Sequence, residues 1–310
     1  MQLLIKERQR PHKLVYFEAL LRRTPSSHPS HPELKENVRR RAAGYAGECW
    51  FDKICMNYNT GEPYIAIPDY SIQGHQIDTL FIFPSFILLI EIKNISGFIE
   101  MDGDKRQFSR TLNGVITGMT NPDDQLYRHE KQISKLIDNK LPVIGIVVFT
   151  NSSCVLSVKN VERRVIHSSG FPYVLDHLIA QHRNSLKHDP LQLSEFFLSL
   201  QPPVQIHEPI PLPYPILTGI FCPDCLSSRM TYSRKFWRCS NCGGKQKNTH
   251  LPALQDYRLL IGNTISNREF RWFSGINSRS NAAAILQSAN FETVGNQKSL
   301  RYIISETGLY

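Results

Sequence analysis

Two carboxylates and a lysine stand where they could share one small reactive site. Asp78 lies near the start of an extended apolar segment, and Glu91 and Lys93 come two positions apart at the end of the next. Residues two apart in a strand project to the same face of a sheet. Neighbouring carboxylates repel unless a divalent cation binds both, and Mg²⁺ favours carboxylate and phosphate oxygens. A lysine beside that ion could orient a water or stabilise charge on a phosphate.

A β-hairpin is the element predicted to bring these side chains together. Residues 76–83 are rich in β-formers, residues 84–85 break the pattern with a proline, and residues 86–90 form a continuous apolar run typical of a strand buried on both faces. If the strands pair antiparallel about this break, Asp78 lies opposite Glu91 or its neighbour. The simpler interpretation is a buried ion pair between the lysine and one carboxylate, which closes a strand end without chemistry.

Four motifs follow one another along the chain: Gly44-Tyr45-Ala46-Gly47-Glu48, Gln76-Ile77-Asp78, Glu91-Ile92-Lys93-Asn94 followed by Gly97, and Asn121-Pro122-Asp123-Asp124-Gln125. In this order they resemble the NERD (nuclease-related) domain, which is placed in the PD-(D/E)XK nuclease superfamily. The resemblance covers about residues 40–150, roughly a third of the chain. Gln-Ile-Asp stands where the name of the superfamily has Pro-Asp, as NERD domains generally show.

The resemblance implies an α/β fold, with a mixed central sheet flanked by helices as in restriction endonucleases. It also implies roles residue by residue: Asp78 and Glu91 would bind Mg²⁺ or Mn²⁺, and Lys93 would be the catalytic lysine. Glu48 would be the acid on the preceding helix, and Gln125 an accessory polar residue on the following one. The implied activity is metal-dependent hydrolysis of phosphodiester bonds in nucleic acid, with DNA favoured. The alternative is a catalytically silent nucleic-acid-binding or scaffold protein that retains the fold.

Composition indicates an ordinary globular protein. The chain has 310 residues, of which 41% are hydrophobic and 20% charged, enough for two or three domains. No apolar run approaches the roughly 18 residues that span a bilayer, and no signal-peptide core follows the N-terminus. The sequence therefore predicts a cytoplasmic protein without a membrane partner, and it leaves the oligomeric state open.

The net charge of +9 is distributed unevenly. Residues 1–40 carry nine Lys or Arg against four acids, and residues 219–250 carry six against one, whereas residues 41–218 carry 15 against 18. The candidate catalytic segment is thus acidic and its flanks are basic. This pattern suits a site that attracts metal cations between surfaces that hold polyphosphate. Charge that serves only solubility is the alternative explanation.

Four of the seven cysteines form two C-x-x-C pairs separated by thirteen residues. They are Cys222, Cys225, Cys239 and Cys242. Two such pairs at this separation predict a closed tetrahedral Zn²⁺ site in a small zinc ribbon at residues 219–250. A redox motif would need a βαβ context that is missing here, and an odd number of cysteines argues against a disulfide framework.

The domain boundaries follow from composition. We expect an N-terminal helical extension at residues 1–40, the nuclease-like domain at residues 41–200, and a semi-rigid linker with six prolines at residues 201–218. Besides the hairpin, strands are predicted at residues 64–70, 97–101, 107–112 and 143–149. Helices are predicted near residues 14–22, from residue 32 to about 56, from residue 122, and twice within residues 173–200.

Residues 251–310 resemble a winged-helix domain. The predicted order is three helices and then a hairpin, at residues 254–261, 267–273, 278–287 and 291–304. Ser266 and Glu269 predict a capping box at the start of the second helix. In a winged helix, Arg279 would begin the recognition helix and Lys298 would lie on the wing, where both could contact nucleic acid. A winged helix that binds protein is the alternative.

Overall fold

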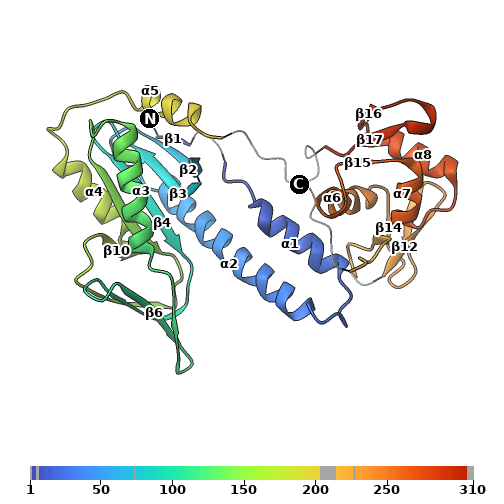
Figure 1. The fold of residues 1–310 in the computed structure, drawn as a ribbon, viewed down its shortest axis with the longest axis horizontal. Coiled ribbons are helices and arrows are strands. Elements are labelled where there is room, and N and C mark those ends of the chain that lie inside the picture. Colours follow the sequence, from blue (N-terminus) through green and yellow to red (C-terminus); the bar gives the residue numbers. More distant parts are fainter. Residues whose placement is uncertain (1, 5–6, 73, 203–213, 226–227, 306–310) are drawn as a thin grey trace. The chain divides into compact units, whose positions relative to one another are not determined.

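The computed structural model describes residues 2–4, 7–72, 74–202, 214–225 and 228–305 (Figure 1). The chain divides into two compact units. Unit 1 comprises Met1–Arg10 and Arg41–Gln205, and unit 2 comprises Pro11–Arg40 and Ile206–Tyr310. The finer division into five parts stays a prediction. In the part of the chain that the structure describes, no helix combines the length and the apolar character needed to cross a membrane.

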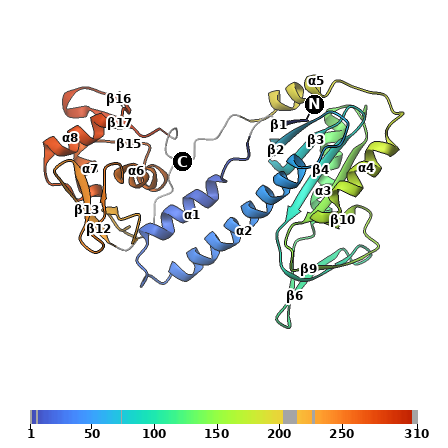
Figure 2. The ribbon, with the colours of Figure 1, turned by 180° about the vertical axis from the view of Figure 1, so that it is seen from behind.

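Unit 1 is built on a six-stranded mixed sheet (Figures 1 and 2). In spatial order its strands are β1 (Gln2–Leu4), β2 (Tyr64–Ile72), β3 (His75–Ile82), β4 (Ile87–Lys93), β8 (Val143–Phe149) and β10 (Arg164–His167). The pairs β2–β3 and β3–β4 are antiparallel, and the pairs β1–β2, β4–β8 and β8–β10 are parallel. The predicted α/β class with a mixed sheet is therefore confirmed.

Helices cover both faces of this sheet. The core on one face includes residues of α3 (Pro122–Leu136) and α5 (Pro190–Ser199). The core on the other face includes residues of α2 (His31–Met56) and α4 (Phe171–Gln181), and the short helix η1 (Ser168–Gly170) precedes α4. Successive side chains of a strand alternate, so Leu89 of β4 joins the first core and Leu88 the second.

A smaller four-stranded sheet extends unit 1. Its order is β7 (Val115–Gly118), β6 (Gln107–Leu112), β5 (Gly97–Asp102) and β9 (Cys154–Lys159). Ile99, Met101 and Phe108 connect it to the core beneath α3. The sequence predicted β5 and β6 but not β7 and β9, because β7 is exposed along its length and β9 is at most half-buried.

Unit 2 contains α1 (His12–Arg23) and two small sheets. The ribbon sheet is antiparallel, with β11 (Ile220–Phe221), β12 (Arg229–Ser233), β13 (Phe236–Cys239) and β14 (Lys245–Gln246). After it come α6 (His250–Leu260), β15 (Thr264–Ile265), α7 (Asn267–Ser274), α8 (Arg279–Ser288), β16 (Glu292–Val294), η2 (Gln297–Ser299) and β17 (Arg301–Ile303). The three helices and the hairpin lie where the sequence predicted them, and the capping box of Ser266 and Glu269 is present. The winged-helix assignment stays a prediction.

The ribbon and the C-terminal helices of unit 2 share one hydrophobic core. Cys222 and Trp237 of the ribbon belong to the same buried cluster as Phe270 and Phe273 of α7. Arg23 of α1 is also buried in this unit, where its side chain is 1% exposed and pairs with Asp256 of α6. The ribbon thus packs against the C-terminal helices and does not fold around a core of its own.

Candidate functional site

Acidic residues lie across from one another on three neighbouring strands of unit 1. The backbone pairs on either side of Asp69 and Asp78 place these two residues opposite each other on β2 and β3. Thr79 pairs with Ile90, and the next step of the antiparallel register puts Asp78 opposite Glu91 of β4. The hairpin therefore has the register that the sequence argument required.

Glu91 and Lys93 interact directly beside Asp78. Lys93 Nζ donates a hydrogen bond to Glu91 Oε1 at 2.5 Å, and the N–H of Ile92 donates to Asp78 Oδ2 at 2.7 Å. The side chain of Glu91 is 3% exposed, and its second oxygen, Oε2, has no hydrogen-bond partner among the described residues. Buried polar atoms normally have partners. An orphaned carboxylate oxygen beside a second carboxylate fits the donor set of a hard divalent ion.

Arg8 brings a positive charge into this cluster from the N-terminal segment. Its side chain is 2% exposed. It pairs with three carboxylates, those of Asp52 at 2.7 Å, Asp69 at 3.0 Å and Glu48 at 3.2 Å. Arg8 also donates to Thr79 Oγ1 at 2.8 Å and to the carbonyl oxygen of Asp78 at 3.0 Å. The guanidinium therefore joins Glu48 and Asp52 on α2 to the acidic strands.

Arg8, Asp52 and Asp69 were missed by the sequence analysis. Asp52 follows Glu48 by four residues in a predicted helix, so the i,i+4 spacing could have placed both acids on one helix face. Asp69 lies inside a predicted strand, and Arg8 lies in a basic N-terminal stretch. No spacing rule connects either residue with the hairpin.

Crowding of the acids perturbs their protonation. Burial and the nearby charge of Asp78 raise the pKa of Glu91 to about 8, although Lys93 opposes the shift. Burial and the charge of Asp78 likewise raise the pKa of Glu48 to about 7, against the effect of Arg8. Burial alone would lower the pKa of Lys93, but the surrounding carboxylates outweigh it and raise that pKa. Without a metal ion, the cluster thus tends to hold protons that a cation could displace.

A close approach of α2 to the strand ends positions Glu48. A Cβ added to Gly47 would lie 2.4 Å from Asn94 Cβ and 2.6 Å from Thr150 Oγ1, so only glycine permits this distance. Asn94 Nδ2 also donates to the carbonyl oxygen of Ala43 at 2.7 Å. The contact explains one of the two glycines in the helix, whereas a Cβ on Gly44 would meet no atom within 4 Å.

The carboxylates are less tightly gathered than a preformed metal cage. Within the described ranges, the cysteines are the only group of three or more His, Cys, Asp or Glu residues whose ligand atoms all lie within 4.8 Å. Gln125 lies half-buried in the first turn of α3, whose N-cap is Asn121. Its predicted role beside Lys93 stays a prediction.

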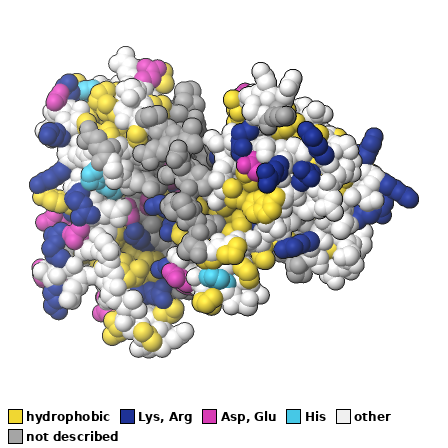
Figure 3. Space-filling model, turned by 45° about the vertical axis from the view of Figure 1, so that its right-hand side comes forward, with side chains coloured by type: hydrophobic (Ala, Val, Ile, Leu, Met, Phe, Trp, Pro, Cys, Tyr) yellow, Lys and Arg dark blue, Asp and Glu magenta, His cyan; other side chains and the backbone are white. Residues whose placement is uncertain are grey.

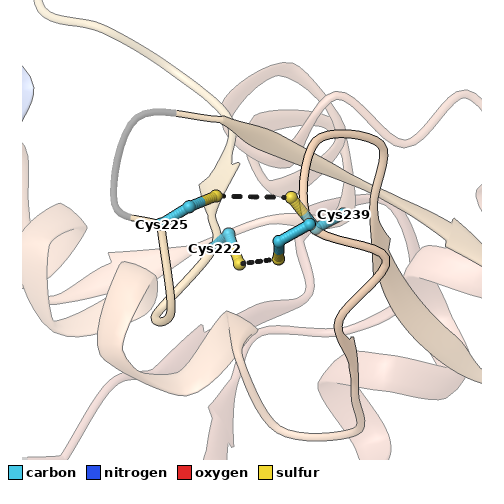
Figure 4. A group of neighbouring side chains, drawn as sticks. Cys222, Cys225 and Cys239 are labelled. Carbon is cyan, nitrogen blue, oxygen red and sulfur yellow. Dashed lines mark hydrogen bonds between the residues drawn. The ribbon is translucent and has the colours of Figure 1, made fainter.

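Four thiols converge in the ribbon of unit 2. The Sγ atoms of Cys222 and Cys242 are 3.6 Å apart, and those of Cys225 and Cys239 are 3.5 Å apart (Figure 4). Tetrahedral Zn²⁺ with bonds of about 2.3 Å would separate its sulfurs by about 3.8 Å. The observed spacing and the all-thiolate donor set therefore fit a closed zinc site.

The two residues proposed to contact nucleic acid lie in unit 2. Arg279 is exposed at the first position of α8, whose N-cap is Ser278. Lys298 lies in η2, and its side chain is outside the part that the structure describes. The structure therefore places Arg279 where solvent or a ligand can reach it.

Part of unit 1 matches a known protein family. Residues 43–150, which contain Glu48, Asp78, Glu91 and Lys93, match the nuclease-related domain family, NERD. A solved chain similar to this one is the small subunit (R.BspD6I2) of the heterodimeric restriction endonuclease R.BspD6I, with 14% identity, coverage of 61% of this chain and 88% of that chain, and a TM-score of 0.23. No curated protein matches the chain.

Proposed function

We propose that unit 1 is a metal-dependent nuclease that hydrolyses phosphodiester bonds of nucleic acid, with DNA favoured. The observation that supports this most is the convergence of Asp78, Glu91 and Lys93 at one hairpin inside a nuclease-related domain. A structural ion pair would need only one carboxylate for the lysine. The second carboxylate, on half-buried Asp78, adds repulsion, which makes sense where a cation binds.

Asp78 and Glu91 are the residues that would hold Mg²⁺ or Mn²⁺, with the carbonyl oxygen of Ile92 as a further ligand. The orphaned Oε2 of Glu91 supports this assignment. When bound, such an ion would acidify a water and stabilise negative charge on phosphate oxygens.

The other residues of the cluster would orient the reactants. Lys93 remains protonated at neutral pH because its pKa is raised, so it could position the attacking water and offset charge on the scissile phosphate. Glu48, with a pKa raised to about 7, could accept a hydrogen bond from that water or exchange a proton with it. Gln125 would help to orient Lys93 or the substrate.

A cleavage panel with Mg²⁺ and with Mn²⁺ tests the proposal on single-stranded and duplex DNA and RNA. Lys93→Ala should lower the cleavage rate by at least about 100-fold, the usual cost of one electrostatic group, while metal and nucleic-acid binding persist. Asp78→Asn should lose both metal binding and cleavage. Lys159→Ala, at an exposed lysine of β9, is the matched control. Wild-type protein that cleaves nothing in the panel would leave the silent scaffold as the better function.

We also propose that unit 2 binds nucleic acid and that Zn²⁺ maintains its ribbon. The support is the basic composition of residues 219–250 and the Lys and Arg side chains on the visible face of this unit in Figure 3. Arg279→Ala and Lys298→Ala should each weaken binding. Each should also lower the slope of log affinity against log salt by about 0.9 for every duplex phosphate that the shortened side chain can no longer reach. Binding of the full-length protein that is insensitive to both substitutions would favour a protein-interaction module.

A further inference from the structure

A cavity of about 640 Å³ opens beside the candidate active site in unit 1. We call it the Trp50 pocket; its lining includes Trp50, Gly47, Asn94, Thr150, Asn151 and His167. These residues come from α2 and from the carboxyl ends of β4, β8 and β10. Crevices at the carboxyl ends of parallel strands are a common place for ligands in α/β folds.

The pocket adjoins the reactive cluster through two pairs of consecutive residues. Asn94 follows Lys93, and Gly47 precedes Glu48. Because side chains alternate along β4 and just beyond it, Asn94 turns toward α2 while Lys93 turns toward the acids. A polynucleotide that crosses this edge of the sheet could therefore place one phosphate at Lys93 and a neighbouring nucleotide in the pocket.

The pocket wall is apolar and uncharged. Trp50 is 53% exposed, and Ile54 and Pro172 also line the cavity. Among the described residues that line it, none is Asp, Glu, Lys or Arg. Such a wall does not suit a phosphate or a metal ion, but it suits a flat, neutral aromatic group.

A polar rim completes the pocket. Asn151 Nδ2 donates to Asn94 Oδ1 at 3.1 Å, and His167 Nε2 lies 3.3 Å from the carbonyl oxygen of Asn151. These contacts hold the rim in place. Thr150 is 8% exposed, and its Oγ1 has no hydrogen-bond partner within the described residues. That oxygen is itself shielded from solvent, so the polar side chains that the rim presents to the cavity include those of Asn94, Asn151 and His167.

We propose that the Trp50 pocket takes an unpaired nucleobase next to the scissile phosphate, so that the substrate is single-stranded or locally unpaired nucleic acid. This inference rests on the proposed nuclease function. The base stacks on the indole of Trp50, and its polar edge faces the polar rim of Asn94, Asn151 and His167. A base inside a duplex is stacked on both sides and cannot enter without leaving its pair.

Binding of oligonucleotides to full-length Lys93→Ala protein in Mg²⁺ tests the proposal without cleavage. The probes are a single strand and its duplex, each with one 2-aminopurine. Stacking on an aromatic side chain contributes about 1–3 kcal/mol per base, so adding Trp50→Ala should weaken single-strand binding by about 5- to 150-fold. The same substitution should leave duplex binding nearly unchanged. Binding of the single strand should change the 2-aminopurine emission only when Trp50 is present. Trp50→Phe should retain most of the affinity, and Tyr173→Ala, at a 79% exposed aromatic outside the pocket, is the control.

The outcomes separate this proposal from the nuclease assignment. Equal losses for single strand and duplex, or no loss with Trp50→Ala, would overturn the base pocket even if the wild-type protein cleaves. Selective loss of single-strand affinity would support the pocket even if the wild-type protein cleaves nothing. Failure of the Lys93→Ala protein to bind single strands at all would also overturn it.

Discussion

Each unit of this protein contains a buried arginine, and the two arginines have different surroundings. Arg23 in unit 2 pairs with one acid, Asp256, and donates to the carbonyl oxygen of Gly219 at 2.6 Å. Its guanidinium also lies 4.6 Å from the ring centre of Phe221 and 4.8 Å from that of Phe273. Arg8 in unit 1 instead pairs with three carboxylates, and the two further acids of the hairpin lie beside them.

The difference in charge balance distinguishes a structural contact from a reactive site. Among the described residues around Arg8, five carboxylates face two cations, Arg8 and Lys93, and the pKa values of the acids Glu48 and Glu91 are raised. Around Arg23, one carboxylate serves two arginines, and burial lowers the pKa of Arg23. A buried arginine with one matched acid holds a fold together, whereas an excess of buried acid leaves a place for another cation.

Loss of the proposed zinc site should have the largest effect. It should unfold the surroundings of Arg23 and leave those of Arg8 intact. Cys222→Ser removes one thiolate from a site whose metal contributes about 10–16 kcal/mol of apparent folding free energy in small zinc peptides. Because Cys222 belongs to the shared core, unit 2 should lose its structure around Arg23 while unit 1 stays folded around Arg8. Zinc content and limited proteolysis of the full chain measure this. Proteolysis that also degrades residues 41–200 would show that the units do not fold separately.

Removal of Arg23 should have the next largest effect. Arg23→Met leaves Asp256 buried, and breaking a buried pair costs about 3–5 kcal/mol; the low end applies here because Arg22 still pairs with Asp256 at 2.7 Å. Arg22→Met is the matched control, since this side chain is 49% exposed and its loss should cost at most about 1 kcal/mol. Chemical denaturation measures both, with and without Mg²⁺. If Mg²⁺ restored the stability of the Arg23→Met protein, a purely structural role of Arg23 would be contradicted.

Removal of Arg8 should cost less and should respond to metal. Arg8→Met leaves three carboxylates without their common partner, but these are 14–24% exposed and can take up water or protons, so we expect a loss of about 2 kcal/mol at pH 8. Mg²⁺ or Mn²⁺ should reverse most of this loss, because the ion replaces the missing charge. The same denaturation series tests it. A loss that divalent ions do not reduce would place Arg8 in the same class as Arg23.

The smallest predicted effect is the pH dependence of the metal-free protein. The raised pKa values of Glu48 and Glu91 mean that the native chain keeps protons that the unfolded chain has already released above about pH 4.5. This contribution to stability is complete at acidic pH and is lost as pH rises through 7 and 8. The melting temperature should therefore fall by about 2–4 °C between pH 7.5 and 8.5, roughly 1 kcal/mol for a unit of this size. Glu91→Gln should flatten the profile, and a rise with pH would contradict the prediction.

The sequence predicts best the elements whose signals are local. The apolar runs of β4 and β8 identify buried strands, and the proline between residues 83 and 86 identifies the hairpin that joins Asp78 to Glu91. Strands β1, β7 and β10 are three or four residues long, and the half-exposed or exposed side chains of β7 and β10 show no periodic burial. Periodicity needs longer segments to identify a strand.

The missed part of the site depends on contacts between distant residues. Arg8 lies 40, 44 and 61 positions from Glu48, Asp52 and Asp69. A single basic residue near a terminus has many possible partners, and only the folded chain selects among them. The Trp50 pocket was missed for the same reason, because its residues come from three strand ends and from α2, η1 and α4, and each of these contributes only a few.

The four thiols of unit 2 have a consequence for the effect of oxidants. The Zn²⁺ proposed for the ribbon would not change oxidation state, but the four cysteines that would hold it can be oxidised, and Cys242 is exposed. Peroxide should therefore attack the ribbon, expel the metal and disrupt the unit proposed to bind nucleic acid. The carboxylates and the lysine of the candidate active site do not react with peroxide under conditions that oxidise thiols. Oxidation would thus abolish nucleic-acid binding by unit 2 while the candidate active site of unit 1 stays intact. A thiol reductant with fresh Zn²⁺ would restore binding.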